Sequence, residues 1–210
     1  MSDWKLYLKN KKFTISLILI IILLIATLSF FSRFLIYVEN RPGFSFDDPI
    51  LKLFSAIDLN LYIFPLIYLS ILSGLIILAA SPEDFFTAIL AYVMLNWVRM
   101  LLMYVMPLNT PIGTIDLQDP LVFILGAGQK ITKDLFFSGH TATLFLIFLA
   151  VKNKKMKIIY LIATLIVGLF VMLQKAHYSA DVFTALFVSY SVYKISGNIF
   201  RVLFKKESKR

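Results

Sequence analysis

Long apolar runs constrain this chain more than any other feature of its sequence. The first, Phe13–Phe31, follows a short basic segment, and further runs cover Leu61–Ala80, Phe85–Met106 and Ile158–Leu173. About 20 mostly apolar residues are enough for an α-helix to cross a bilayer. The chain is 60% hydrophobic and 16% charged, which is far from the composition of an average soluble domain. Its length is therefore best counted in membrane spans.

Two further helices are expected after the longest polar interval, residues 107–136. The fourth span begins at the first histidine motif and ends at Val151, and the sixth covers about Ser179–Ser196. The predicted fold is all-α, a single integral membrane domain over residues 1–210 with six transmembrane helices. The apolar piece Leu121–Leu125 is too short to cross and is expected to lie at the membrane interface or to dip back into it.

The basic residues predict the orientation of the chain. Of the 21 Lys and Arg residues, four lie in the first twelve positions, four lie between Lys152 and Lys157, and six follow from Lys194 onward. In a six-span chain these segments share one side, which the positive-inside rule assigns to the cytoplasm. Both termini are thus expected to be cytoplasmic. The net charge of +9 then reflects cytoplasmic loops and anionic lipid rather than nucleic acid.

Both histidines of the chain stand at the ends of apolar runs. The predicted orientation puts His140, at the start of the fourth helix, and His177, after the fifth, at the extracytoplasmic face. Asp181 follows His177 by four residues, so the two share a face of the sixth helix. Arg99 lies about two turns from the end of the third helix on the same side. Four side chains with useful chemistry are therefore predicted to lie at one depth.

This set of side chains suits phosphoryl transfer. Histidine can attack phosphorus when a third group holds its tautomer, and Asp181 can accept the N–H of His177. A protonated His140 can give its proton to the leaving oxygen. Without cysteine in the chain, disulfides, iron–sulfur clusters and thiol nucleophiles are excluded.

The start of the fourth helix offers a place for the phosphate. Free backbone N–H groups after Ser138 favour an anion, and Gly139 lets the phosphate approach the backbone. Arg99, Lys133 and Lys175 are candidates to neutralise its charge. The acidic Asp134, which precedes this helix, is interpreted as its cap.

These motifs resemble the type 2 phosphatidic acid phosphatase superfamily, and within it the sphingomyelin-synthase-like branch. Ser138–Thr141 matches the Ser-Gly-His-Thr of the family, and His177–Val182 is similar to the His-Tyr-Thr-x-Asp-Val of the branch. Arg99–Pro107 resembles an Arg-led, proline-ended segment of the branch, and Asp134 stands where the branch has an acidic residue. The resemblance covers about residues 85–195.

The resemblance implies six transmembrane helices, a His-His-Asp triad, and transfer or hydrolysis of a phospholipid head group without metal or other cofactor. His177 would be the nucleophile, Asp181 its partner and His140 the acid for the leaving group. A Lys-x6-Arg-Pro motif is not evident, and Phe170 and Val171 stand where phosphatases carry a Ser-Arg pair. These departures favour the synthase-like branch.

Three functions stay open at this point. The first is a lipid phosphotransferase, which moves a phospho-head group from a phospholipid to a lipid alcohol such as ceramide or diacylglycerol. The second is a lipid phosphatase, in which water is the acceptor. The third is a non-catalytic transporter or scaffold, although transporter sites usually lie near the membrane midplane and these polar residues gather at one face. The expected partners are lipids and the membrane, not nucleic acid.

Overall fold

The computed structural model describes residues 2–120 and 130–205, and within these residues every regular element is helical. The α-helices are α1 (Ser2–Lys9), α2 (Lys11–Asn40), α3 (Asn60–Leu78), α4 (Pro82–Val105), α6 (Gly139–Ala150), α7 (Lys154–Leu173) and α8 (Ser179–Phe200). A short 3₁₀ turn, η1 (Leu51–Leu53), and a π-helical turn, η2 (Arg201–Lys205), complete the set. The all-α prediction is confirmed for this part of the chain.

Four of the described helices are long and apolar enough to cross a membrane, namely α2, α3, α4 and α7. α6 has only 12 residues, or about 18 Å, against a hydrocarbon core of about 30 Å. α8 has 22 residues, but Asp181, Lys194 and several hydroxyl side chains make it less apolar. Spanning by α6 and α8 therefore remains a prediction. The expectation for Leu121–Leu125 falls outside the described residues.

Local sequence signals explain where the helices begin. Ser81 caps α4 by accepting the Asp84 amide, and Pro82 takes the first helical position, as its missing N–H permits. Ser138 caps α6 by accepting the Thr141 amide. The interpretation of Asp134 as the cap of this helix is therefore wrong, because Ser138 adjoins the first turn while Asp134 lies four residues earlier.

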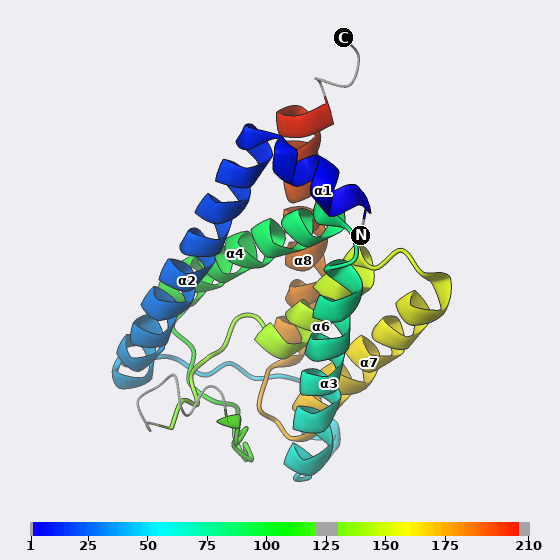
Figure 1. Cartoon of the computed structure of the whole chain (residues 1–210). Helices are drawn as coiled ribbons and strands as arrows, with labels where there is room; N and C mark the ends of the chain where they lie inside the picture. The colour runs from blue at the N-terminus through cyan, green and yellow to red at the C-terminus, as the bar shows by residue number, and fades with distance from the viewer. Residues whose placement is uncertain (1, 121–129, 206–210) are drawn as a thin grey trace.

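The short helix α6 lies at the centre of the bundle, where it packs on α3, α4, α7 and α8 (Figure 1). Ala142 and Leu144 of α6 are completely buried. On α3, a Cβ at Gly74 would come within 2.8 Å of the Ile147 side chain, so the glycine lets these helices approach closely. α6 therefore contacts four other helices, and none of its residues is fully exposed.

Several loops of the chain gather toward one end of the bundle. η2 and the junction of α1 and α2 lie uppermost in Figure 1, the N-terminus and the turn at 79–81 lie below them, and the turn at 151–153 lies at the right. The loops at 41–59, 106–119 and 174–178 lie toward the lower end, the loop end.

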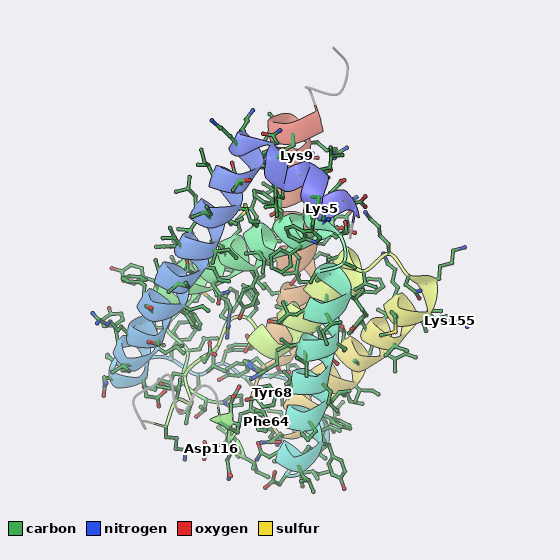
Figure 2. All side chains as sticks on the ribbon, in the orientation of Figure 1. Lys5, Lys9, Phe64, Tyr68, Asp116 and Lys155 are labelled. Atoms are coloured by element: carbon green, nitrogen blue, oxygen red, sulfur yellow. The ribbon has the colours of Figure 1, made fainter. Side chains whose placement is uncertain are left out.

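The labelled side chains agree with this arrangement. In Figure 2, Lys5 and Lys9 lie in the upper part, Lys155 lies at the right edge, and Tyr68 and Asp116 lie toward the loop end. The order in which six helices would cross a membrane stays a prediction. Which end faces the cytoplasm stays a prediction.

Backbone contacts tie the loops together at the loop end. The Phe44 amide donates to the Pro107 carbonyl, and the Asn109 amide donates back to the Phe44 carbonyl, both at 2.9 Å. A Cβ at Gly43 would lie 2.8 Å from the backbone of Leu108, so only glycine fits where the two strands of chain meet. These contacts hold the 41–59 loop beside the 106–119 loop.

Two buried or half-buried side chains anchor the loops to helices. Gln174, completely buried, donates to the Ile115 and Asp116 carbonyls and accepts the Leu59 amide. Glu39, in the last turn of α2, accepts the amides of Thr132 and Lys133 and the hydroxyl of Thr132. The chain before and after the undescribed residues is thus held against fixed helix ends.

Candidate active site

The first part of the site is a histidine–aspartate pair at the start of α8. His177 Nδ1 lies 3.1 Å from Asp181 Oδ2, and the same oxygen accepts the Tyr178 amide at 3.3 Å. His177 is 3% exposed and Asp181 is completely buried. The contact between the two residues is present, but the shared helix face predicted from their spacing is wrong, because α8 begins at Ser179 and His177 precedes it. Because Asp181 binds Nδ1, the Nε2 atom of His177 remains for another partner.

The second part is a histidine–aspartate pair at the start of α6. His140 Nε2 lies 2.8 Å from Asp119 Oδ2, and the Tyr68 hydroxyl of α3 donates to the other carboxylate oxygen. The Phe64 ring meets the imidazole edge-on, with ring centres 6.1 Å apart. His140 Nδ1 is buried without a hydrogen-bond partner. The two histidines therefore bind their carboxylates through opposite ring nitrogens.

Asp119 and Tyr68 were not predicted from the sequence as site residues. Asp119 stands 21 residues before His140 and Tyr68 stands 51 residues before Asp119, so no helical or strand period relates them. The one local signal is that Asp119 precedes Pro120 in a proline-rich interval, which indicates only a turn.

The third part is an ion pair beside the first turn of α6. Arg99 Nη2 donates to both carboxylate oxygens of Asp134, at 2.7 and 2.6 Å. A Cβ at Gly139 would lie 2.3 Å from the guanidinium, so glycine is required here for Arg99 to lie against the helix. The space at Gly139 that was expected to admit a phosphate holds this guanidinium instead. Arg99 Nε is buried without a partner.

One pocket joins these parts. About 440 Å³ of space is lined by His140, His177, Asp119, Asp134 and other residues that include Asp116 and Thr132. Most of the lining comes from residues 114–119 and 131–134, which therefore lie beside the two histidines. Asp116 makes an ion pair with Lys130 at the rim.

A backbone bond fixes the two histidine motifs relative to each other. The Ser138 amide donates to the Asp181 carbonyl at 3.2 Å. The Ser138 hydroxyl, completely buried, is bonded to the amide and the hydroxyl of Thr141. Ser138 therefore joins the starts of α6 and α8, and its hydroxyl is committed within its own helix turn.

The structure does not bring the two predicted lysines into this pocket. Lys133 Nζ donates to the Arg41 carbonyl at 2.9 Å. Lys175 lies over the Phe54 ring, 5.9 Å from its centre, and lines a separate surface pocket with Asp47. Their contribution to phosphate binding stays a prediction.

Electrostatics strengthen the attachment of α8. Asp48 accepts the Ser179 amide at 2.7 Å. Burial acts to raise the pKa of Asp48, but hydrogen bonds from Ser179, Leu51 and Ile50 outweigh it and lower that pKa below its usual value of 3.8. A charged carboxylate at a helix N-terminus also interacts favourably with the helix dipole. Asp48 therefore holds the first turn of α8 from the 41–59 loop.

Comparisons with known proteins address the second half of the chain. No curated protein matches the sequence. Among the described residues, no group of three or more His, Cys, Asp or Glu side chains is placed to hold a metal ion. Residues 133–198 match the family model described as PAP2 superfamily C-terminal, a segment that contains both histidines and Asp181. Over these residues the chain is similar to the PAP2 superfamily, a likeness that favours an activity of the lipid phosphatase or phosphotransferase type, and the four apolar helices are consistent with a multi-pass membrane protein.

Proposed function

We propose that this protein transfers a phospho-head group from a membrane phospholipid to a lipid alcohol through a phosphohistidine on His177. One observation carries the proposal. Both histidines line one pocket, and each binds a different carboxylate through a different ring nitrogen. A nucleophile and a proton donor need this kind of complementary arrangement, in which each ring keeps one nitrogen for the substrate.

In the first step, His177 Nε2 attacks the phosphorus of the donor. The new N–P bond forms as the bond from phosphorus to the lipid oxygen breaks, and His140 Nδ1 gives its proton to that oxygen. Asp181 accepts the Nδ1–H of His177 and stabilises the positive charge that develops on the ring. The products are a lipid alcohol and a phosphohistidine that carries the head group.

In the second step, the acceptor hydroxyl attacks the phosphohistidine. His140, now neutral, takes the hydroxyl proton at Nδ1, the new P–O bond forms, and the N–P bond to His177 breaks. Asp119 holds the His140 ring through Nε2 in both steps, so the same nitrogen gives and takes the proton. The enzyme returns to its initial state.

The phosphate charge is neutralised by Arg99 and the start of α6 in this proposal. The guanidinium lies against Gly139 in the first turn of α6, and both the guanidinium and a helix N-terminus attract an anion. Asp134 holds Arg99 in the structure, so the phosphate would compete with this carboxylate. The positive charge that neutralises the phosphate is thus assigned to Arg99 and not to Lys133 or Lys175, because those two side chains have partners outside the pocket.

Lipid mass spectrometry tests the proposed activity. Purified protein is incubated with vesicles of mixed phospholipids, with and without ceramide or diacylglycerol as acceptor. We expect a new phospholipid that forms only with acceptor and not with His177→Ala. Loss of a lipid phosphate with no new lipid would instead indicate a phosphatase, and no change in any lipid would contradict both enzymes.

The intermediate is tested separately. A donor that carries radioactive phosphate should leave acid-labile label on the protein when the acceptor is absent. The label should be lost in His177→Ala. Equal labelling of wild type and His177→Ala would rule out this nucleophile.

The predicted orientation is tested with single cysteines, because the chain has none of its own. Ile112, at the loop end, is 90% exposed, and Lys155 lies in the first turn of α7, at the opposite end of that helix from the 174–178 loop. The adjacent Gly113 has a φ of +77°, where cysteine would be strained. A membrane-impermeant maleimide should label Ile112→Cys from outside and Lys155→Cys only after the membrane is opened. Labelling of both from one side would overturn the orientation.

A further inference from the structure

A second cavity lies deeper in the bundle than the candidate active site. It has about 690 Å³ of empty space, part of it open to the surroundings, and lies between α3, α4 and α6 with Leu24 of α2 at its edge. The residues that line it carry no charge, and the polar groups among their side chains are the hydroxyls of Tyr92 and Thr143. Thr143 already donates to the Gly139 carbonyl. The cavity therefore offers an almost purely apolar lining.

On α3, one helix face joins the active site to this cavity. Tyr68 donates to Asp119 in the site, while Ile71, Leu75 and Leu78 line the cavity. These residues follow one another at spacings of three and four, which places them on one side of the helix. From Ile71 to Leu78 the cavity extends for about 10 Å along α3.

The other two helices repeat this order. On α6, His140 lies in the site and Thr143 and Ile147 line the cavity. On α4, Arg99 lies beside the site and Tyr92, two turns away, lines the cavity. On each of these three helices, a polar site residue lies toward the loop end, and the residues that line the cavity lie in the turns farther from that end. The cavity lies in line with the site and not at an unrelated place.

The opening of the cavity faces an apolar surface. α2 packs on α4, but α2 and α3 are not among the helix pairs that pack closely, and the cavity is lined by Leu24 of α2 and by the exposed Leu75 of α3. Nearby exposed side chains are also aliphatic, such as Leu23 and Ile25 of α2 and Leu72 of α3. A molecule that enters here comes from the hydrocarbon of the membrane.

We propose that this cavity holds one hydrocarbon chain of the lipid substrate while the phosphate lies at His140 and His177. The proposal rests on the proposed function for the identity of the substrate. A polar or charged occupant would leave its hydrogen-bonding groups without partners in this lining, whereas a hydrocarbon chain has none to satisfy. Because bilayer hydrocarbon is as apolar as the cavity, the chain gains little affinity there. The cavity acts by placing the phosphate in line with His177.

A filled cavity tests this assignment. Leu75→Trp, at a lining residue that is 43% exposed, puts an indole into the opening. Leu72→Trp makes the same change on the same helix at an exposed residue outside the cavity. We expect Leu75→Trp to lower the transfer rate about tenfold for long-chain donors and to leave the rate for soluble short-chain donors unchanged. Leu72→Trp should change neither. An equal effect of Leu75→Trp on both donors, or no effect on either, would overturn the proposal.

A binding measurement separates this proposal from the proposed function. Vesicles that contain a phospholipid with a diazirine in the middle of one chain are irradiated with the protein, and the cross-linked peptides are identified by mass spectrometry. We expect cross-links to lining residues of α3, α4 and α6 that disappear in Leu75→Trp and persist in Leu72→Trp. These cross-links without any lipid turnover would contradict the function and support the cavity. Turnover with cross-links confined to the outer surface would support the function and contradict the cavity.

Discussion

The two histidines of the site obtain their carboxylates by different routes. His177 and Asp181 are four residues apart in the sequence, and their contact is local, because His177 lies two residues before α8 begins and Asp181 lies in its first turn. His140 meets Asp119 across 21 residues, and that carboxylate is held in turn by Tyr68 from α3. The first pair is made by local structure, and the second depends on how a loop and another helix are placed.

The two pairs also differ in burial, and the locally formed pair is the more buried of the two. The side chains of His177 and Asp181 are 4% and 0% exposed, whereas those of His140 and Asp119 are 17% and 10% exposed. A nucleophile benefits from a fixed position. A proton donor and acceptor must serve two different oxygens, one on the leaving lipid and one on the incoming alcohol. The comparison therefore predicts that the local pair controls the formation of the intermediate and the long-range pair controls proton transfer.

The largest effect is expected for the nucleophile. His177→Ala should lower the turnover of every donor by about 10⁴-fold or more, because no other group in the pocket replaces the N–P bond. Rates of product formation by purified protein measure this. Since the His177 side chain is buried beside Asp181, circular dichroism should confirm that the variant is folded. Substantial remaining turnover by folded protein would exclude the mechanism.

A smaller and more selective effect is expected for the other histidine. His140→Ala should lower turnover by about 10²–10⁴-fold for natural lipid donors, because their alcohol leaving group needs a proton. A donor with a nitrophenol leaving group needs no proton and should lose much less. The comparison of the two donors in one variant is the measurement. Equal losses for both would mean that His140 does not protonate the leaving group.

Substitution of each carboxylate tests the same difference between the two pairs. Asp119→Asn should reduce turnover by about 10- to 100-fold. The neutral amide orients the His140 ring less firmly than the carboxylate does, and it does not stabilise the positive charge of the protonated ring. The loss should be largest for donors with poor leaving groups, and the pH–rate profile should shift.

Asp181→Asn should instead slow labelling of the protein by radioactive phosphate. Asp47→Asn, at an exposed pair with Lys52, is the matched control. Identical behaviour of Asp119→Asn and Asp181→Asn would remove the distinction between the pairs.

The smallest effect concerns a long-range contact at the start of α8. Asp48 accepts the Ser179 amide, and its lowered pKa means that its charge stabilises the folded state above pH 3.8. This contribution is lost as the pH falls through the lowered pKa. Asp48→Asn should reduce the free energy of unfolding by about 0.5–1 kcal/mol near neutral pH. Unfolding in detergent, followed by circular dichroism, should show the difference from wild type shrink in acid. A difference that is constant with pH would mean that the charge has no part in it.

The positions of the helices could be predicted from the sequence because their causes are local. Each predicted span coincides with a helix, and the Ser81–Pro82 cap lies where its residues indicate. The end of α2 shows the limit of that reasoning. The apolar run stops at Phe31 before Arg33, but the helix continues to Asn40, because burial of Leu35 and Val38 against Met103 of α4 needs only one apolar face.

Two features of the site depended on contacts that no local pattern records. Asp119 reaches His140 only through the course of the loop, and Asp134 reaches Arg99 rather than the helix cap. Lys175 follows the same reasoning in reverse. It stands two residues before His177 in the sequence, but it is not in the same pocket. Its backbone φ is +55°, and its side chain lies over the Phe54 ring, beside a different pocket.

The sequence by itself thus determined a chain of apolar helices, the starts of those helices and the His177–Asp181 pair, because each depends on residues within a turn or two of one another. The tertiary structure alone decided the partner of His140, the place of Arg99 against Gly139 and the apolar cavity in line with the site. These features arise from side chains far apart in the chain, whose meeting depends on how whole helices pack. The physical reason is that helical periodicity acts over a few residues, whereas packing selects contacts over the entire bundle.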